Sequence, residues 1–370
     1  MLYNEAKEGR ESEEMFQPGL KGVTAVQTEL SNIDGNKGLL TYRGTTVQSL
    51  VENYSFEEVA YFLLYNKFPD AEQLKEFTLN LIQNRIIPDY LVTILNQLPQ
   101  KMQLMDVMRT IISAYYTDSN ENIFQTAEKL IAFMPTLISY RYRQVNDRPI
   151  IKPDHELNHV ENFIYMLTGK RNSNHAKILE TYLMLTMEHG LNASTFAARV
   201  TISTESDLVS AITSALGTMK GPLHGGAPSG VIALLEEIGT KEAICEVIHK
   251  KLKNKEKIMG FGHRVYKTVD PRAEALKTIL MQMDDLPEWI TLALETEKET
   301  IKILQQSKPD KKLYTNVEYY AAAIMKTINI DPDLFTPIFS SSRIVGWCAH
   351  AIEQLDNNTI FRPNAIYVGK

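Results

Sequence analysis

The stretch MGFGHRVYKTVDPR, residues 259–272, stands apart from the sequence around it, because it gathers glycine, proline, histidine and cationic side chains into one short segment. A second segment of this kind, GPLHGGA, occupies residues 221–227. The sequence on both sides of these segments has the helical spacing of apolar residues. Glycine lets the backbone approach a ligand closely, so we expect two loops that expose the chemistry of an otherwise helical protein.

Apolar residues at helical spacing extend over most of the remaining chain. A capping box at Ser55 opens the first expected helix, and the pattern restarts at Asp70. Further helices are expected at residues 88–98, 103–117, 120–146, 155–168, 174–189, 207–219, 227–238, 240–254, 271–283, 287–306, 316–329 and 337–356. Strand-like pieces at residues 23–28 and Leu39–Tyr42 flank a turn. The sequence therefore predicts an all-α fold with a few short β pieces near the N-terminus.

The composition limits the partners and the location that we expect. The chain has 370 residues and a net charge of −6, so it offers no broad basic field to nucleic acid or to an anionic membrane surface. No apolar run reaches the roughly 18–20 residues of a membrane span, and the first 17 residues mix acids and bases rather than forming a secretory signal. Two cysteines, Cys245 and Cys348, without CxxC spacing favour a reducing compartment. We expect a soluble, cytoplasmic protein.

On residue chemistry alone, His224 and His263 are the leading candidates for acid–base catalysis. Each lies in a glycine-rich loop, and imidazole titrates near neutral pH. Either histidine alone could instead cap a neighbouring helix, an alternative that is weaker for two histidines in two such loops. Arg272 and Arg343 suit carboxylate binding, because the planar guanidinium matches a carboxylate, although surface arginines are usually solvated.

A competing motif, HELNH at residues 155–159, satisfies the H-E-x-x-H pattern of zinc hydrolases. In that pattern two histidines one helical turn apart bind zinc, and the glutamate activates water. Helical spacing places Val160 and Ile164 on the apolar face, and it predicts that His155 and His159 lie on the solvent side. We therefore expect no metal site here and interpret the match as chance.

Together, the motifs resemble the signature loops of the citrate synthase family. The segments GPLHGGA and GFGHRVYK, followed by DPR, occur in the order and spacing of that family. Further agreement comes from IDG at 33–35, YRG at 42–44, EHGLNAS at 188–194 and NVEYY at 316–320. The resemblance runs from about residue 19 to the C-terminus and is far more specific than a single short motif.

The resemblance implies a role for each matching residue. His224 would hydrogen-bond the thioester oxygen while an acyl-CoA becomes an enol or enolate, in the manner of an oxyanion hole. His263 would polarise and protonate the carbonyl of oxaloacetate. His189, Arg272 and Arg343 would hold the two carboxylates of oxaloacetate.

The resemblance also implies contacts to coenzyme A and to a second subunit. Arg362 would enter the site of the neighbouring subunit, which implies at least a homodimer. Coenzyme A would be contacted by a set of loop residues: Met259, Gly260, Phe261, Gly262 and Lys267. The CoA thioester would be a co-substrate, so no tightly bound cofactor is expected.

Glu318 is the one departure from the family pattern. The catalytic base of the family is usually aspartate, whereas NVEYY has glutamate at this position. The carboxylate is retained on a side chain one methylene longer, which shifts the base by roughly an ångström. Alternatively, Glu318 is only an acidic residue that the dipole at a helix N-terminus stabilises. We take the catalytic role as the expectation.

These observations predict a two-domain helical enzyme with its substrates in the cleft. Residues 1–222 and 325–370 would form a large domain, and residues 223–324 a small one. The expected reaction condenses acetyl-CoA with oxaloacetate and hydrolyses citryl-CoA, as in the tricarboxylic acid cycle. A 2-methylcitrate synthase using propionyl-CoA would share these motifs, since one methylene is worth only about 1–3 kcal/mol. A catalytically silent helical scaffold is a further alternative, favoured only by Glu318.

Overall fold

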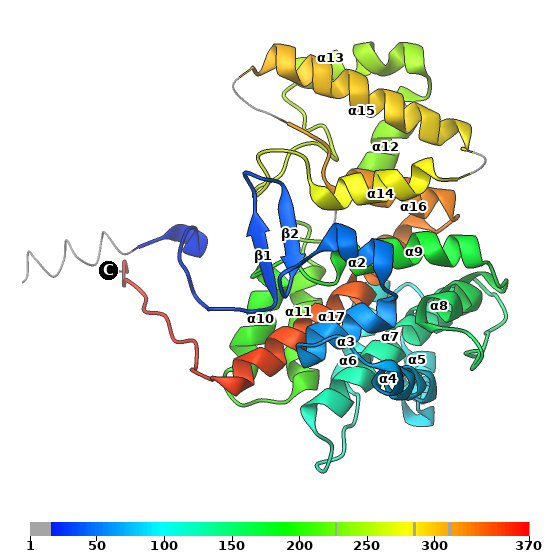
Figure 1. Ribbon diagram of the computed structural model, residues 1–370, viewed down its shortest axis with the longest axis vertical. Helices are drawn as coiled ribbons and strands as arrows, with labels where there is room; N and C mark the ends of the chain where they lie inside the picture. Colours follow the sequence, from blue (N-terminus) through cyan, green and yellow to red (C-terminus); the bar gives the residue numbers. More distant parts are fainter. Residues whose placement is uncertain (1–15, 226–227, 284–285, 310–312, 370) are drawn as a thin grey trace, which may run out of the picture.

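The computed structural model describes residues 16–225, 228–283, 286–309 and 313–369. Within these ranges the protein is mostly helical, with one small sheet near the N-terminus (Figure 1). The α-helices are α2 (Val47–Asn53), α3 (Phe56–Tyr65), α4 (Ala71–Gln83), α5 (Asp89–Gln97), α6 (Leu104–Ser113), α7 (Ile123–Val145), α8 (His159–Thr168), α9 (Ser173–Thr186), α10 (Ala193–Ile202), α11 (Leu208–Met219), α12 (Pro228–Ile238), α13 (Ile244–Lys253), α14 (Pro271–Met281), α15 (Glu288–Ser307), α16 (Val317–Thr327) and α17 (Phe335–Asp356). The strands are β1 (Ser31–Asp34), β2 (Leu39–Tyr42) and β3 (Thr45–Thr46), and short 3-10 turns occur at Pro18–Leu20, Lys241–Ala243 and Pro332–Leu334.

The sheet is antiparallel, with the strand order β1-β2-β3. Asp34 shapes the turn between β1 and β2, because its Oδ1 accepts hydrogen bonds from the N–H groups of Asn36 and Lys37, each at 3.1 Å. The predicted fold class, all-α with short β pieces near the N-terminus, is confirmed. The strand expected at residues 23–28 is wrong. Ser31 pairs with Tyr42 at the end of β2, so this register leaves the earlier residues beyond the sheet.

Capping signals in the sequence set several helix ends as expected. Ser55 and Glu58 form both halves of a capping box at the start of α3. Gly169 ends α8 in the left-handed conformation, with φ of 80°. Asp70 caps α4 by accepting hydrogen bonds from the first turn.

Other expected helices begin or end elsewhere. The helix expected at residues 155–168 begins only at His159, because Asn158 caps it by accepting the N–H of Glu161. The helix expected at residues 103–117 ends at Ser113.

The region around EHGLNAS differs most from the expectation. α9 ends at Thr186 rather than near residue 189, which leaves Glu188 and His189 in a loop before Gly190. Asn192 then caps α10, a helix that the periodicity did not reveal; α2 was missed as well. Both helices are short, and α10 begins within the EHGLNAS motif.

Helix α17 forms the centre of the larger core. Its side chains are buried along most of its length, and the main hydrophobic cluster joins it to helices that include α3, α7, α9, α11, α14 and α16. A smaller cluster lies among α12, α13 and α15, drawn at the top of Figure 1, and consists of Leu234, Ile238, Ile244, Ile248, Ile258, Ile303 and Leu304. Helix α12 contributes side chains to both clusters. The division into domains at residues 223–324 stays a prediction.

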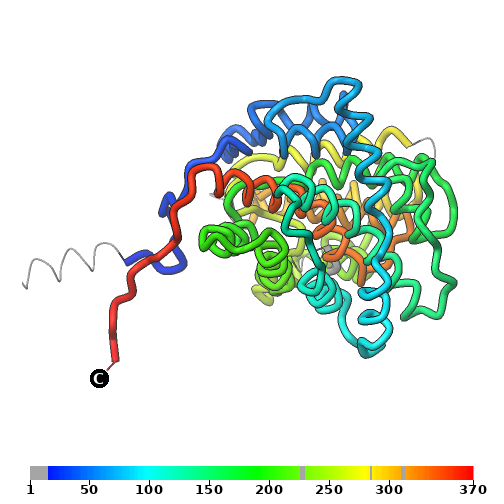
Figure 2. The backbone as a smooth tube through the Cα atoms, turned by 90° about the horizontal axis from the view of Figure 1, so that it is seen from below, coloured from blue at the N-terminus to red at the C-terminus, as the bar shows by residue number. Residues whose placement is uncertain are grey.

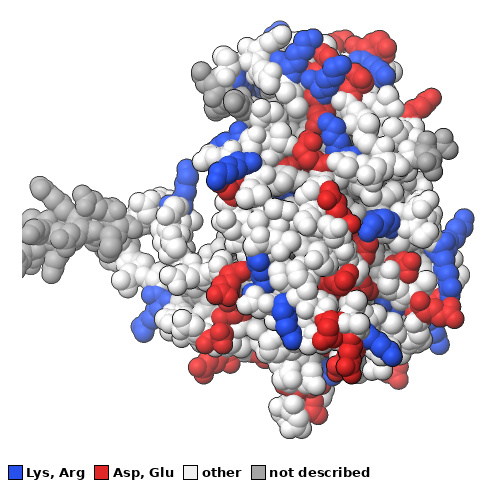
Figure 3. All heavy atoms as spheres, in the orientation of Figure 1, with Lys and Arg blue, Asp and Glu red and all other residues white. Residues whose placement is uncertain are grey.

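Cationic and acidic side chains are interspersed on the face drawn in Figure 3. In the described ranges, every helix is too short or too polar to span a membrane. Residues 1–15, most of the segment that we compared with a secretory signal, lie outside the described residues. The chain beyond α17 leaves the body as an extended segment (Figure 2).

Candidate active site

The loop of residues 259–267 is held against the start of α16. Asn316 donates its backbone N–H to Gly260 O at 2.9 Å and its side-chain Nδ2–H to Gly262 O at 3.0 Å. Gly260 has φ of 83°, and a Cβ at this position would lie 2.7 Å from the ring of Tyr319. Only glycine fits there without strain. The first candidate loop is therefore fixed beside the helix that carries the candidate base.

The β1–β2 turn clamps the same loop from another side. Lys267 donates its N–H to Gly35 O at 2.8 Å. A Cβ on Gly35 would lie 2.2 Å from Val265 O, and a Cβ on Gly38 would lie 2.6 Å from Val269 O. The two glycines allow this close backbone approach. The small sheet thus helps to shape the site.

His263 has a defined tautomer. Its Nδ1 accepts the N–H groups of Val265 at 3.0 Å and Tyr266 at 3.1 Å, so in the neutral ring the proton lies on Nε2. Nε2 lies 3.5 Å from Nη2 of Arg272. Burial, and then the Arg272 charge, lower the pKa of His263 to about 4. At neutral pH His263 is an uncharged donor through Nε2.

Arg272 is paired with Asp270 at the start of α14. Its Nε and Nη2 donate to the two carboxylate oxygens at 3.0 Å and 2.9 Å. Oδ2 of Asp270 also accepts the N–H of Val317 at 3.1 Å, which ties α14 to α16. Burial opposes ionisation of both groups. Nevertheless, the charge of Arg272 holds the pKa of Asp270 below the usual value for aspartate, and the charge of Asp270 holds the pKa of Arg272 above the usual value for arginine. The pair is therefore ionised.

Arg343 is a buried cation on α17. Its Nε donates to Thr186 O at 2.7 Å, and its guanidinium carbon lies 4.8 Å from the centre of the Phe339 ring. Burial lowers its pKa, and the charge of Glu188 opposes that shift. The Arg343 charge in turn lowers the pKa of His189 and of His224. Arg343 therefore lies among the candidate histidines.

His189 lies against His263. The two ring centres are 5.7 Å apart in an edge-to-face arrangement, and Nε2 of His189 lies 3.1 Å from the hydroxyl of Tyr266. Burial, followed by the charges of Arg272 and Arg343, holds the pKa of His189 well below its usual value. His189 is thus a neutral ring beside the guanidinium groups.

Glu188 is a fully buried carboxylate behind this cluster. Its Oε1 accepts the N–H of Gly190 at 2.5 Å and lies 3.0 Å from Nε2 of His350. Nδ1 of His350 accepts Nε–H of Arg199 at 2.9 Å, so in the neutral ring the His350 proton lies on Nε2. Although burial raises the pKa of Glu188, His350 and Arg343 hold it below its usual value. Glu188 supplies a counter-charge to Arg343.

His224 has the opposite tautomer to His263. Its Nε2 accepts the N–H of Ser194 at 3.3 Å and lies 2.8 Å from Ser194 Oγ, which accepts Nε1–H of Trp347 at 3.1 Å. Because Nε2 accepts, the proton of the neutral ring lies on Nδ1. Burial, and then Arg343, lower the pKa of His224 to about 4. His224 is therefore an uncharged donor through Nδ1.

Glu318 lies in the first turn of α16. Its N–H donates to Oδ1 of Asn316, the cap of the helix, at 3.1 Å. Burial raises the pKa of its carboxyl, while the charge of Arg272 opposes the shift. A raised pKa makes a carboxylate a stronger base. The group thus has an environment suited to proton abstraction.

The candidate contacts to coenzyme A differ in exposure. Gly260 is buried, whereas Met259, Phe261 and Gly262 are half-buried. Lys267 is exposed, and its Nζ donates to Arg264 O at 3.3 Å. This segment therefore provides backbone groups and one exposed ammonium group for binding CoA.

Arg362 lies apart from these residues within one chain. The preceding Phe361 donates its N–H to Ser203 Oγ at 3.3 Å, and its ring packs edge-on against Phe196 with centres 5.3 Å apart. Beyond this anchor the chain leaves the body (Figure 2), and Arg362 is exposed. The structure does not bring Arg362 together with the other candidates of its own chain.

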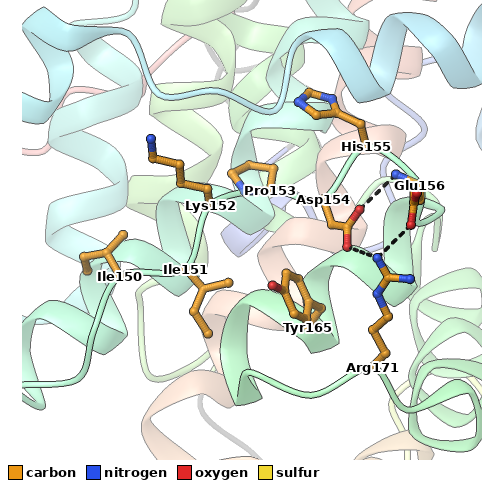
Figure 4. Close-up of a pocket in the computed structure, with 9 residues that line it drawn as sticks. All are labelled: Ile150, Ile151, Lys152, Pro153, Asp154, His155, Glu156, Tyr165 and Arg171. Atoms are coloured by element: carbon orange, nitrogen blue, oxygen red, sulfur yellow. Dashed lines mark hydrogen bonds and ion pairs between the residues drawn. The ribbon is translucent and has the colours of Figure 1, made fainter.

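The HELNH segment does not form a zincin site. His155 and Glu156 lie in a turn before α8, so the two histidines are not one turn apart on a helix. Glu156 instead faces Arg171, at 2.9 Å, at the edge of an open surface hollow (Figure 4). The expectation that His159 faces solvent is wrong: its ring is buried and stacks on Phe56, because the helix begins later than expected. Across the described residues, no three His, Cys, Asp or Glu side chains are grouped to hold a metal.

Sequence reasoning left four supporting residues without a role. Asp270 pairs with Arg272, Ser194 orients His224, and both Glu188 and Tyr266 adjoin the cluster around His189. All four lie within the motifs, and each is at most five residues from a candidate in the sequence. Their place in the motif was the available signal, but their contacts depend on the folded loop geometry.

Comparisons with known proteins identify the family of this chain. The family model described as "Citrate synthase, C-terminal domain" matches residues 19–364. A citrate synthase of Synechocystis is 38% identical over 96% of this chain and 91% of its own length. A 2-methylcitrate synthase of Shewanella oneidensis is 38% identical over 95% of this chain and 94% of its own length.

A solved structure gives the same result for the fold. The ternary complex of citrate synthase from Thermoplasma acidophilum with carboxymethyl coenzyme A and oxaloacetate matches with a TM-score of 0.88. That chain is 30% identical, and the match covers 96% of each chain. This protein belongs to the citrate synthase family of condensing transferases.

Proposed function

We propose that this protein condenses acetyl-CoA with oxaloacetate and hydrolyses the resulting citryl-CoA to citrate and CoA. The observation that carries the proposal is a pair of neutral histidines whose protons lie on different ring nitrogens. His224 donates through Nδ1 and His263 through Nε2, because backbone N–H groups occupy the other nitrogen of each ring. Such donors suit two developing oxyanions, one on the thioester and one on the ketone.

The bond-making steps follow from these groups. Glu318 takes a proton from the methyl carbon of acetyl-CoA, while Nδ1–H of His224 hydrogen-bonds the thioester oxygen of the forming enolate. The methyl carbon then bonds to the ketone carbon of oxaloacetate as the C=O π bond breaks, and Nε2 of His263 transfers its proton to the ketone oxygen. Water cleaves the thioester and releases CoA. The raised pKa of Glu318 supports its role as the base.

Arg272, Arg343 and His189 bind oxaloacetate. Two cations match the two carboxylates, and a guanidinium can bind a carboxylate through two parallel hydrogen bonds. Both arginines are buried and ionised, each with an acidic residue as counter-charge. This arrangement supports a carboxylate pocket that is ready before substrate arrives.

The proposal extends to CoA, the assembly and the location. Met259, Gly260, Phe261 and Gly262 with Lys267 would bind CoA, and the Thermoplasma acidophilum complex, which holds a CoA derivative beside oxaloacetate, supports this pairing of ligands. We further propose a cytoplasmic homodimer in which Arg362 completes the partner's site, supported by its exposure on a segment that leaves the body. Binding of oxaloacetate would move the domain of residues 223–324 and complete the acyl-CoA site.

A second candidate is 2-methylcitrate synthesis from propionyl-CoA. The similarity to the Shewanella oneidensis 2-methylcitrate synthase equals that to the Synechocystis citrate synthase, at 38% identity each. A difference of one methylene is worth about 1–3 kcal/mol, so the two acyl groups should differ in kcat/KM by roughly 10- to 200-fold.

The test is a CoA-thiol release assay with acetyl-CoA and propionyl-CoA in parallel, with and without oxaloacetate. We expect release that requires oxaloacetate and is faster with acetyl-CoA. Higher kcat/KM with propionyl-CoA would favour the second candidate. No oxaloacetate-dependent release with either thioester would contradict both.

A further inference from the structure

Tyr266 is a buried aromatic side chain in an otherwise open part of the loop. It is 3% exposed, whereas Val265 beside it is 40% exposed and Lys267 is exposed as well. The ring is held inward because the Gly35 turn lies on the backbone of this segment. The sequence motif contains Tyr266 but gives it no role.

The contacts of Tyr266 reach three candidate residues at once. Its hydroxyl lies 3.1 Å from Nε2 of His189, and its ring centre lies 4.7 Å from that of His263. The guanidinium carbon of Arg272 lies 5.8 Å from the ring centre, within cation–π range. The backbone N–H of Tyr266 also donates to Nδ1 of His263.

These contacts have different consequences for the two histidines. The backbone bond to His263 does not depend on the side chain, and a phenylalanine ring would keep the packing against His263 and Arg272. The Tyr266 ring also packs edge-on against His189, with ring centres 5.8 Å apart, and phenylalanine would keep this contact as well; only the hydrogen bond of the hydroxyl to His189 would be lost. Apart from the backbone of His189 itself, no other described residue forms a hydrogen bond with the His189 side chain, so this contact contributes to fixing the direction of the ring among the cations.

We propose that Tyr266 is a positioning residue, whose hydroxyl fixes the orientation and tautomer of His189 for binding a carboxylate of oxaloacetate. The inference rests on the proposed function for its substrate, but the hydrogen bond itself exists without ligand. A free imidazole would sample other orientations, and its ordering would then weaken oxaloacetate binding. Burial raises the pKa of Tyr266, so the phenol stays protonated at neutral pH.

The test uses Tyr266→Phe in the full-length protein, with Tyr65→Phe as a matched control. Tyr65 also donates its hydroxyl to a side chain, Oε1 of Glu128 at 2.5 Å, but lies in α3 and outside the candidate site. Loss of one neutral hydrogen bond predicts a rise in KM for oxaloacetate of about three- to tenfold. We expect kcat and the KM for acetyl-CoA to stay within about twofold, since the contact serves ground-state binding. Tyr65→Phe should leave both KM values unchanged.

A second readout does not depend on turnover. In ligand-free protein labelled with ¹⁵N-histidine, the imidazole signals of His189, assigned with His189→Asn, should shift in Tyr266→Phe, while those of His224 should not. Unchanged His189 signals would overturn the positioning role even if the enzyme acts on other substrates. A shift in these signals with an unchanged KM for oxaloacetate would also overturn it, because the bond would then not serve binding. Inactive wild-type protein would instead refute the proposed function. The His189 signals would still show whether the hydroxyl of Tyr266 forms the hydrogen bond with His189.

Discussion

Asp270→Asn tests the claim that a buried ion pair holds Arg272 in place. Both side chains are almost fully buried, and the carboxylate accepts hydrogen bonds from Arg272 and from Val317. Asparagine keeps the size and one acceptor but leaves the guanidinium buried without a counter-charge. Breaking a buried pair by removing one partner costs about 3–5 kcal/mol, and because one acceptor remains we expect about 3 kcal/mol.

The assay is urea unfolding of ligand-free protein at pH 7, followed by circular dichroism. Glu299→Gln is the matched control, because its partner Lys302 lies 3.4 Å away in an exposed pair within α15. Such a surface pair contributes at most about 1 kcal/mol. We therefore expect the free energy of unfolding to fall at least about three times as much in Asp270→Asn as in the control.

The stability difference between wild type and Asp270→Asn should depend on pH. Arg272 holds the folded-state pKa of Asp270 below its usual 3.8, so the carboxylate stabilises the fold fully above that pH. The contribution is lost as the pH falls through the lower, folded-state pKa. The gap between wild type and Asp270→Asn should therefore narrow below about pH 3.8. Equal stabilities at pH 7, or a gap that does not change in acid, would refute the reasoning.

Four further predictions concern the chemistry and the assembly. Glu318→Gln should abolish condensation, while calorimetry should still detect binding of oxaloacetate. Glu318→Asp should lower kcat, because the base then lies roughly an ångström too far from the methyl group. Full turnover in Glu318→Gln would show that another residue is the base. The acid limb of kcat/KM should lie above pH 4.5, because burial raises the pKa of Glu318 and the base must be ionised. His224→Ala and His263→Ala should each lower kcat at least about a hundredfold with unchanged circular dichroism. Mixed Arg362→Ala and His263→Ala proteins should regain activity after verified subunit exchange, and no recovery would contradict a shared site.

The sequence predicted the parts of the fold that local signals control. Ser55 and Gly169 mark helix ends through backbone and cap chemistry that involves only nearby residues. Asp270 as the cap and Pro271 as the first helical residue likewise mark the start of α14. The start of α8 was missed because Asn158 caps the helix within the apparent HExxH pattern.

The sequence suffices to name the candidate residues but not to predict their electrostatics. His224, His263 and Arg272 were candidates from their residue chemistry and from the motifs, and the structure gives each a defined partner. The tautomers depend on backbone N–H groups whose direction follows from loop geometry. The counter-charge of Arg343 comes from Glu188, a residue distant in sequence, and no local pattern encodes that contact.

The most direct test of the central claim is the fate of labelled acetyl-CoA. Purified protein is incubated with oxaloacetate and acetyl-CoA carrying ¹³C in both acetyl carbons, and the products are analysed by mass spectrometry. The account predicts citrate two mass units heavier, formed with one CoA per citrate, and none with His263→Ala beyond about one hundredth of the wild-type rate. CoA released without labelled citrate, or labelled citrate formed equally well by His263→Ala, would contradict it.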